Sequence, residues 1–127
     1  MNEIFREIKK EGYITAVVLL ASNGLRAGCC DYFSGDTNLA DMYAAKVSII
    51  IKNVDDLRCE IKDAYKTLRI GIDIGTENQD ESIHLIIEKI NDDFILLAKY
   101  RWENSERLGD AYHKINHYAP QLKNILE

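Results

Sequence analysis

Apolar and polar positions follow two different periods along the chain, and the switches between them predict the order of the elements. Residues 2–10 carry apolar side chains at helical spacing, which predicts a short helix that ends by Gly12. The stretch Ile14–Ala21 is continuously apolar and rich in β-branched residues, which favours a strand buried on both faces. Ser22-Asn23-Gly24 is typical of a turn, so residues 25–30 are predicted to return as the second strand of a hairpin.

The longest helical pattern follows a polar loop and is predicted from about residue 39 to about residue 54, with Asp36 or Thr37 as its cap. Its apolar residues form two stripes, with Ala44 and Ile51 adding to the apolar surface. The first stripe comprises Leu39, Tyr43, Val47, Ile50 and Val54, and the second comprises Met42, Ala45 and Ile49. A helix that covers only its own sheet needs one stripe. The second stripe is covered either by the other helices of the chain or by another subunit, and the shortness of the chain favours a subunit interface.

The second half of the chain predicts three strands and a final helix. Residues 55–66 form a connector that is expected to continue the long helix part-way. Leu68–Ile74 alternates apolar and polar residues, whereas Ser82–Ile90 and Phe94–Tyr100 are more continuously apolar and are joined by a polar turn. The last helix is predicted from about Ser105, and Pro120 within it is expected to kink or restart the helix.

These elements predict an α/β fold of the α+β type in a single domain that spans residues 1–127. The first and fifth strands are apolar on both faces and should be central, whereas the second and third strands alternate and suit the edges. The predicted sheet is five-stranded and antiparallel, with the order second, first, fifth, fourth, third. The middle helix is expected on one face, and the N- and C-terminal helices on the other.

Composition narrows the possible partners and compartment. The net charge of −5 would repel phosphate backbones, so nucleic acid is not an expected partner. No apolar run is long enough to cross a bilayer, and residues 1–11 lack the apolar region of a secretory signal. We therefore expect a cytoplasmic protein without direct membrane insertion. The three cysteines, Cys29, Cys30 and Cys59, are interpreted as reduced thiols and small buried hydrophobes.

The sequence lacks a recognisable catalytic or nucleotide-binding motif, so we predict that the protein is not an enzyme and needs no cofactor. His113 and His117 can share a helical face with Asp110, which is a conceivable metal site. A solvated polar face is the favoured interpretation, and no metal is predicted. His84, alone on a strand, is interpreted as a partly buried side chain rather than a base.

Several stretches of the chain are similar to those of the Roadblock family. They are Glu11-Gly12 before ITAVVLLA, the turn Ser22-Asn23-Gly24-Leu25, the alanine-containing run Leu39–Ala45, the apolar run Phe94–Ala98, and the pair Leu108-Gly109. The resemblance spans roughly Ile4 to Leu126. The chain departs from the family at Asn23, where Asp is frequent, and in the approach Glu103–Gly109. These motifs are patterns of hydrophobicity and turns, which carry more information on fold than on function.

The resemblance implies a dimer, with itself or with a second Roadblock-type subunit, in which the middle helices pack together and the third strands pair edge to edge. The predicted dimer interface comprises Met42, Ala45, Ile49, Arg69, Ile70, Gly71, Ile72 and Asp73.

The resemblance also implies a platform for other proteins. We expect a non-catalytic module that binds and regulates or scaffolds a small Ras-like GTPase; the alternative is a light-chain or scaffold subunit of a dynein-like motor or a membrane-tethered complex. The expected contact surface is the exposed flank of the middle helices with Lys46, Lys52 and Asn53. An arginine finger is not expected, although Arg69, Arg101 and Arg107 are available.

Overall fold

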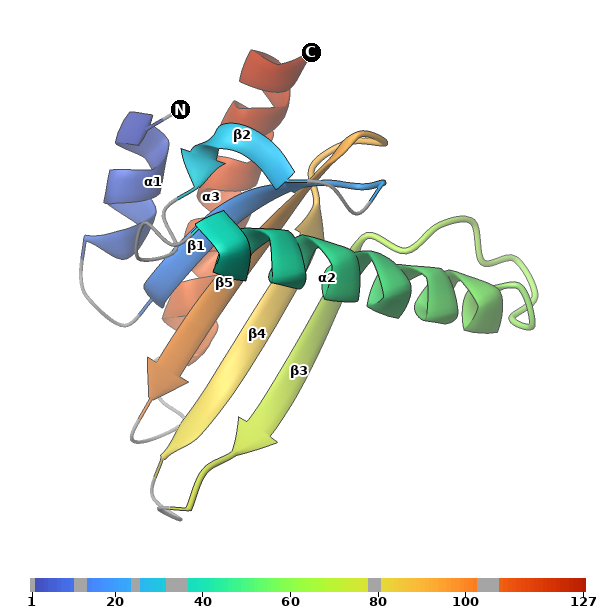
Figure 1. Cartoon of the computed structure of the whole chain (residues 1–127). Coiled ribbons are helices and arrows are strands. Elements are labelled where there is room, and N and C mark those ends of the chain that lie inside the picture. Colours follow the sequence, from blue (N-terminus) through green and yellow to red (C-terminus); the bar gives the residue numbers. More distant parts are fainter. Residues whose placement is uncertain (1, 11–13, 24–25, 32–36, 78–80, 103–107) are drawn as a thin grey trace.

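The computed structural model describes residues 2–10, 14–23, 26–31, 37–77, 81–102 and 108–127 (Figure 1). Their helices and strands follow the predicted order. The elements are α1 (Asn2–Lys9), β1 (Ile14–Ala21), β2 (Arg26–Asp31), α2 (Thr37–Arg58), β3 (Arg69–Gly75), β4 (Ser82–Lys89), β5 (Phe94–Trp102) and α3 (Leu108–Leu126).

The strands form one five-stranded sheet with the order β2-β1-β5-β4-β3, as predicted, and every neighbouring pair is antiparallel. The apolar strands β1 and β5 lie inside because both of their faces are buried. Along β1, Val17 and Leu19 enter the core on one side of the sheet, whereas Val18 and Leu20 enter the core on the other.

The two faces of the sheet carry different helices, which confirms the predicted layers (Figure 1). Phe5 and Ile8 of α1 and Ile115 of α3 pack in one core with the sheet. On the opposite face α2 packs against the sheet, with Ala44, Val47 and Ile51 buried there. The inner face of α2 is thus centred on these three residues. Of the predicted first stripe, Val47 lies on this inner face, whereas Tyr43, Ile50 and Val54 lie at its border and are half-buried. The side chain of Leu39 lies outside the described residues.

Helix α2 covers only part of its face of the sheet. In Figure 1 it crosses one end of the strands and runs out beyond the edge strand β3, so that its C-terminal turns and the following connector project past the sheet. Among the described elements, no helix covers the far halves of β3, β4 and β5 on this side. The helix begins at Thr37, slightly before the predicted start, and its end at Arg58 confirms the expected continuation into the connector.

One of the two alternatives at Pro120 and the interpretation of Cys59 were wrong. Helix α3 continues through Pro120 to Leu126 without the restart. Pro120 is exposed, so the carbonyl that loses its helical N–H partner can be satisfied by another donor. Cys59 is exposed, because it follows the last residue of α2 on the projecting segment rather than lying in the core. The side chains of Cys29 and Cys30 and the residues around Ser105 lie outside the described residues. Of the helices in the described ranges, none has the length and apolarity that a bilayer crossing requires.

Candidate protein interaction surface

The outward face of α2 is apolar over its first half. Met42 is 43% exposed, Ile49 is 60% exposed, and Ala45 between them is also exposed. Helices α1 and α3 pack on the opposite face of the sheet, so they do not cover this stripe. The predicted alternative, coverage within the chain, is therefore wrong. The predicted partner residues Lys46, Lys52 and Asn53 are exposed beside the same stripe.

One flank of α2 is a second apolar surface. Tyr43 and Ile50 are half-buried and pack against the α2 core cluster together with Ile72 and Leu85 of the sheet. Along the helix this flank continues to Leu57, which is 64% exposed. The flank therefore lies on the side of α2 that borders the uncovered part of the sheet.

The projecting segment adds more exposed apolar side chains. Ile61 is 59% exposed, Tyr65 is 83% exposed and Leu68 is 60% exposed. The sequence analysis treated residues 55–66 as a connector and placed Leu68 in the third strand, and it selected none of these residues for a site. The spacing of four residues between Leu57, Ile61 and Tyr65 was the available indication, since it repeats an apolar side chain at about one per helical turn.

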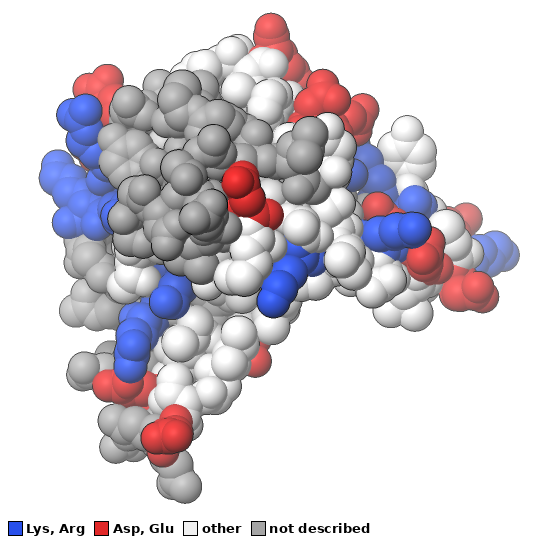
Figure 2. All heavy atoms as spheres, in the orientation of Figure 1, with Lys and Arg blue, Asp and Glu red and all other residues white. Residues whose placement is uncertain are grey.

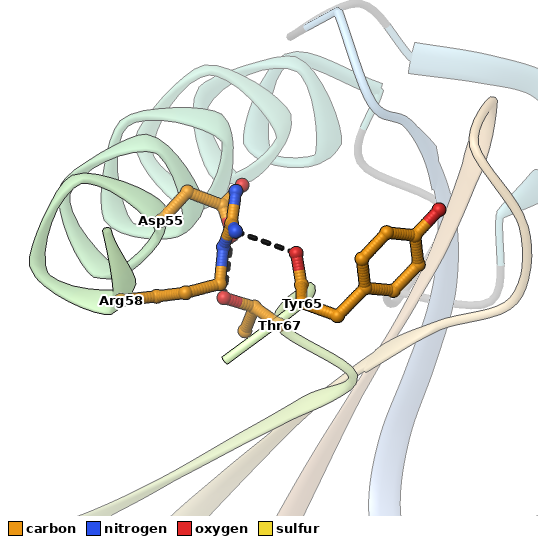
Figure 3. A network of polar contacts seen from close by, with 4 residues as sticks. All are labelled: Asp55, Arg58, Tyr65 and Thr67. Carbon is orange, nitrogen blue, oxygen red and sulfur yellow. Dashed lines mark hydrogen bonds and ion pairs between the residues drawn. The ribbon is translucent and has the colours of Figure 1, made fainter. Parts of the chain in front are cut away.

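A small polar network ties the projecting segment back to α2 (Figure 3). Arg58 contacts the Asp55 carboxylate, with 3.4 Å between Nε and Oδ1, and its Nη1 donates to the backbone carbonyl of Tyr65 at 2.5 Å. The hydroxyl of Thr67 donates to Asp55 Oδ1 at 2.5 Å. This hydrogen bond, aided by the charges of Lys89 and Arg58, lowers the pKa of Asp55 below its usual value of 3.8 against the opposing effect of burial. The network holds residues 59–68 as a defined arm.

Strand β3 is one of the two edge strands of the sheet. It pairs with β4 along its whole length, and its other edge has no strand neighbour among the described residues. On the α2 side, Ile70 and Ile72 are half-buried, Ile74 is 42% exposed, and Ile83 of β4 is half-buried next to Ile74. Figure 2 shows a mostly uncharged surface over this part of the sheet, bordered by lysine or arginine on one side and by acidic groups at the tip. An unpaired edge next to an apolar face is a site for another chain.

The other side of β3 is occupied by a polar cluster that the sequence did not indicate. His84 is only 5% exposed and is paired across the strands with Asp73. Its Nδ1 lies 2.5 Å from Asp73 Oδ1, and its Nε2 lies 2.5 Å from the Tyr112 hydroxyl on α3. Gly71 leaves the space for this cluster, because a Cβ there would overlap the Tyr112 hydroxyl. Burial raises the pKa of Tyr112 above its usual value of 10.0, since it disfavours the phenolate.

The side chain of Arg69 makes its polar contacts within the same chain. It bonds to the Glu88 carboxylate, with 2.5 Å between Nε and Oε2, and to the side-chain oxygen of Asn116. Its guanidinium lies 5.2 Å from the centre of the Tyr112 ring, a cation–π contact. The side chains of Arg69 and Asp73 therefore anchor β3 to β4 and α3, and the strand offers a partner its backbone edge. Arg101 pairs with Glu81 at 2.6 Å, and Arg107 lies outside the described residues.

The conceivable metal site on α3 is an exposed surface. Asp110, His113 and His117 are all exposed, and the His117 ring packs edge-on against Tyr118. Within the described residues there is no group of three or more His, Cys, Asp or Glu side chains placed to hold a metal ion.

Comparison with known proteins identifies the fold. No protein-family model and no curated protein matches the sequence. Among solved structures, Myxococcus xanthus MglB superposes with a TM-score of 0.75 at 15% identity, covering 98% of this chain and 93% of that chain. A Roadblock/LC7 domain from Streptomyces avermitilis superposes with a TM-score of 0.77 at 13% identity, covering 99% of this chain and 97% of that chain.

A third structure, the gliding protein MglB from Thermus thermophilus, gives a TM-score of 0.71 at 14% identity over 98% of this chain and 86% of that chain. At such low identity the likeness concerns the fold alone. The chain has a Roadblock-type fold, as the resemblance in its sequence predicted.

Proposed function

We propose that this chain, with its Roadblock-type fold, works as a dimeric, non-catalytic module that binds a small Ras-like GTPase and regulates or scaffolds it. The dimer is supported by one observation above all. On the same face of the sheet, the end of α2 and the arm project beyond β3, and the far halves of β3, β4 and β5 are left without a covering helix among the described elements (Figure 1). One molecule therefore carries both an apolar arm and a surface for such an arm.

A two-fold axis through the open edge of β3, perpendicular to the sheet, brings these surfaces together. The two β3 strands then pair antiparallel, and each arm lies over the exposed half of its partner's sheet near Ile74 and Ile83. In this arrangement the two α2 helices meet along the flank of Tyr43, Ile50 and Leu57. The proposal thus places the helix–helix contact on this flank, and not on the stripe that the sequence suggested, which comprises Met42, Ala45 and Ile49.

The outward stripe then becomes the surface offered to a GTPase. Met42, Ala45 and Ile49 of the two helices lie side by side across the dyad, flanked by Lys46 and Lys52. Exposed apolar side chains ringed by charge are typical of protein interfaces. The GTPase as partner rests on the resemblance to the Roadblock family. Because Arg69 is held by Glu88 and Asn116, regulation through ordering of the GTPase's switch loops is favoured over an arginine finger.

The test is affinity purification from the native cell, followed by binding and GTP turnover with the small GTPase that is recovered. We expect the GTPase to bind the dimer, and we expect any stimulation of turnover to survive Arg69→Ala, Arg101→Ala and Arg107→Ala. Loss of all stimulation on one arginine substitution, with binding intact, would establish a finger. Recovery of a motor or membrane-tethered complex without a GTPase would instead favour the light-chain role.

A further inference from the structure

A cleft with a volume of about 460 Å³ lies where the turn between β4 and β5 meets the arm that precedes β3 and the C-terminal half of α3. Its lining includes the end of the arm, Lys66–Leu68, but none of the residues of α2 or β3 proposed above for the dimer or the GTPase. Each of the three segments contributes one lysine to its walls: Lys66 from the arm, Lys89 from the end of β4, and Lys123 from α3. Three segments distant in sequence thus converge on one small space.

The charge of the cleft runs against that of the whole chain, which carries a net charge of −5. Two acidic residues also line it, but Glu88 is bound by Arg69, which leaves Asp92 as the acidic lining residue without an ion pair among the described residues. Within the residues that the structure describes, Lys66 and Lys89 form no ion pair. Lys123 contacts Glu127 at 3.8 Å, and both of these side chains are about half exposed. The walls therefore carry three lysines against one carboxylate, Asp92, that forms no ion pair in the described part of the chain, and the Asp55 and Glu127 carboxylates, which interact with Lys89 and Lys123, offset only part of this positive charge.

The rest of the lining is apolar or amide. Ile90 and Ala119 are buried in the floor, and Leu68 at the rim is 60% exposed. The side-chain oxygen of Asn91 accepts the backbone N–H groups of Asp93 and Phe94, which leaves its amide nitrogen as a donor. Pro120 cannot donate to the carbonyl of Asn116, so another donor can bond there.

The arm side of the cleft is held in place before any ligand binds. The backbone N–H of Lys89 donates to the carbonyl of Leu68 at 3.0 Å, and Thr67 is tied to Asp55 (Figure 3). A wall that is already ordered loses little conformational entropy when a ligand settles against it.

We propose that this cleft binds an extended acidic peptide segment of a partner protein. Carboxylates of the segment pair with Lys66, Lys89 and Lys123, an apolar side chain covers Leu68, and backbone groups bond to Asn91 and Asn116. A phosphate group fits less well. Among the described residues, the lining contains lysines but no arginine, whose planar fork suits the several oxygens of one phosphate group.

The probe is a fluorescein-labelled peptide, Gly-Glu-Glu-Leu-Glu-Glu-Gly, and its control has glutamine in place of every glutamate. Fluorescence anisotropy with the full chain should show binding of the acidic peptide that weakens with added salt, and binding at least about tenfold weaker for the glutamine peptide. Amide chemical shifts should move at residues 66–68, 88–92 and 116–123.

The lysine variants have a matched control on the same arm. Lys66→Glu and Lys123→Glu should each weaken binding by about three- to tenfold, because each replaces an attraction by a repulsion. Lys62→Glu, which is also exposed on the arm but does not line the cleft, should leave binding within about twofold.

Three results would overturn the proposal. They are no binding of the acidic peptide by the wild-type chain, equal effects of Lys62→Glu and Lys66→Glu, and displacement of the peptide by inorganic phosphate beyond the effect of chloride at the same ionic strength. The last result would assign the cleft to small anions. Because the proposed dimer and GTPase contacts on α2 and along β3 involve other residues, failure here leaves the proposed function standing.

Discussion

At the scale of single residues, Gly71 determines whether the edge strand can lie against α3. A methyl group at this position would overlap the Tyr112 hydroxyl and lie 3.1 Å from His84 Nε2, whereas a methyl group at Gly75 of the same strand meets no atom within 4 Å. We expect Gly71→Ala to lower the free energy of unfolding by about 1–3 kcal/mol. Gly75→Ala should change it by less than about 0.5 kcal/mol.

Urea unfolding of the two glycine variants measures both values. Tyr112→Phe removes the atom that an alanine at position 71 would strike, so the combined variant should lose less stability than the two single variants added together. Equal losses from Gly71→Ala and Gly75→Ala would show that the cluster of Asp73, His84 and Tyr112 rearranges at no cost.

Asp55 gives a prediction with a defined dependence on pH. Its pKa is lowered in the folded chain, chiefly by the hydrogen bond from Thr67, so its stabilising effect is complete above 3.8 and is lost as the pH falls through the lowered folded value. At pH 7, Asp55→Asn should reduce the free energy of unfolding by about 1 kcal/mol.

The matched control for Asp55 is its neighbour Asp56, which is exposed. Asp56→Asn should alter stability by less than about 0.5 kcal/mol at pH 7. Thermal or urea unfolding between pH 7 and pH 3 should show the difference between wild type and Asp55→Asn shrinking toward the acid end. A difference that stays constant over this range would mean that the carboxylate charge contributes nothing to the network.

At the scale of elements, α2 presents two apolar surfaces whose roles can be separated by a matched pair of substitutions. Leu57 and Ile49 are similarly exposed, at 64% and 60%, and lie on the same helix. A charge at Leu57 would be buried in the proposed dimer, so Leu57→Asp should weaken dimerisation at least about tenfold. Ile49→Asp should leave the dimer intact and weaken binding of the GTPase.

Sedimentation velocity and a pulldown with the GTPase measure the two effects of this pair. A monomeric Ile49→Asp variant beside a dimeric Leu57→Asp variant would restore the outward stripe as the helix–helix contact. Circular dichroism of both variants controls for misfolding, which is not expected because both side chains are already exposed in the single chain.

The length of α2 illustrates what local patterns miss at this scale. The apolar periodicity ends at Val54, and a continuation into residues 55–66 was expected without a defined end. The helix runs to Arg58 because Asp55 and Arg58 are held by Thr67 and by the carbonyl of Tyr65. Those partners belong to the returning arm, so they stabilise the last turn only once the arm has folded back. Helix α3 does not restart at Pro120 for a related reason: buried Ala119 and Leu122 hold the neighbouring turns against the core.

At the scale of the whole molecule, the proposal requires a dimer of twice 14.6 kDa. Light scattering at tens of micromolar should report that mass, as a dimerisation constant of about 1 µM or tighter implies. Amide exchange should then show residues of β3 better protected at high than at low protein concentration, because the open edge gains backbone partners. A stable monomer at this concentration would contradict the two-fold arrangement.

The sequence by itself determined the elements, the strand order and the distribution of helices over the two faces. Each of these follows from local information, since the period of apolar residues reports which faces of an element are buried, and strands buried on both faces must be central. The exposure of Met42, Ala45 and Ile49 followed as well, because a helix with apolar residues on two sides covers only one of them with its own sheet.

Only the tertiary structure decided which residues of different helices and strands lie next to one another. The angle at which α2 crosses the sheet sets how far its arm projects and which part of β3 stays uncovered (Figure 1). The same placement brings Tyr112 to His84, and Lys66, Lys89 and Lys123 to one cleft. These distances join residues far apart in the chain and depend on crossing angles and sheet twist, which the period of a single element does not encode.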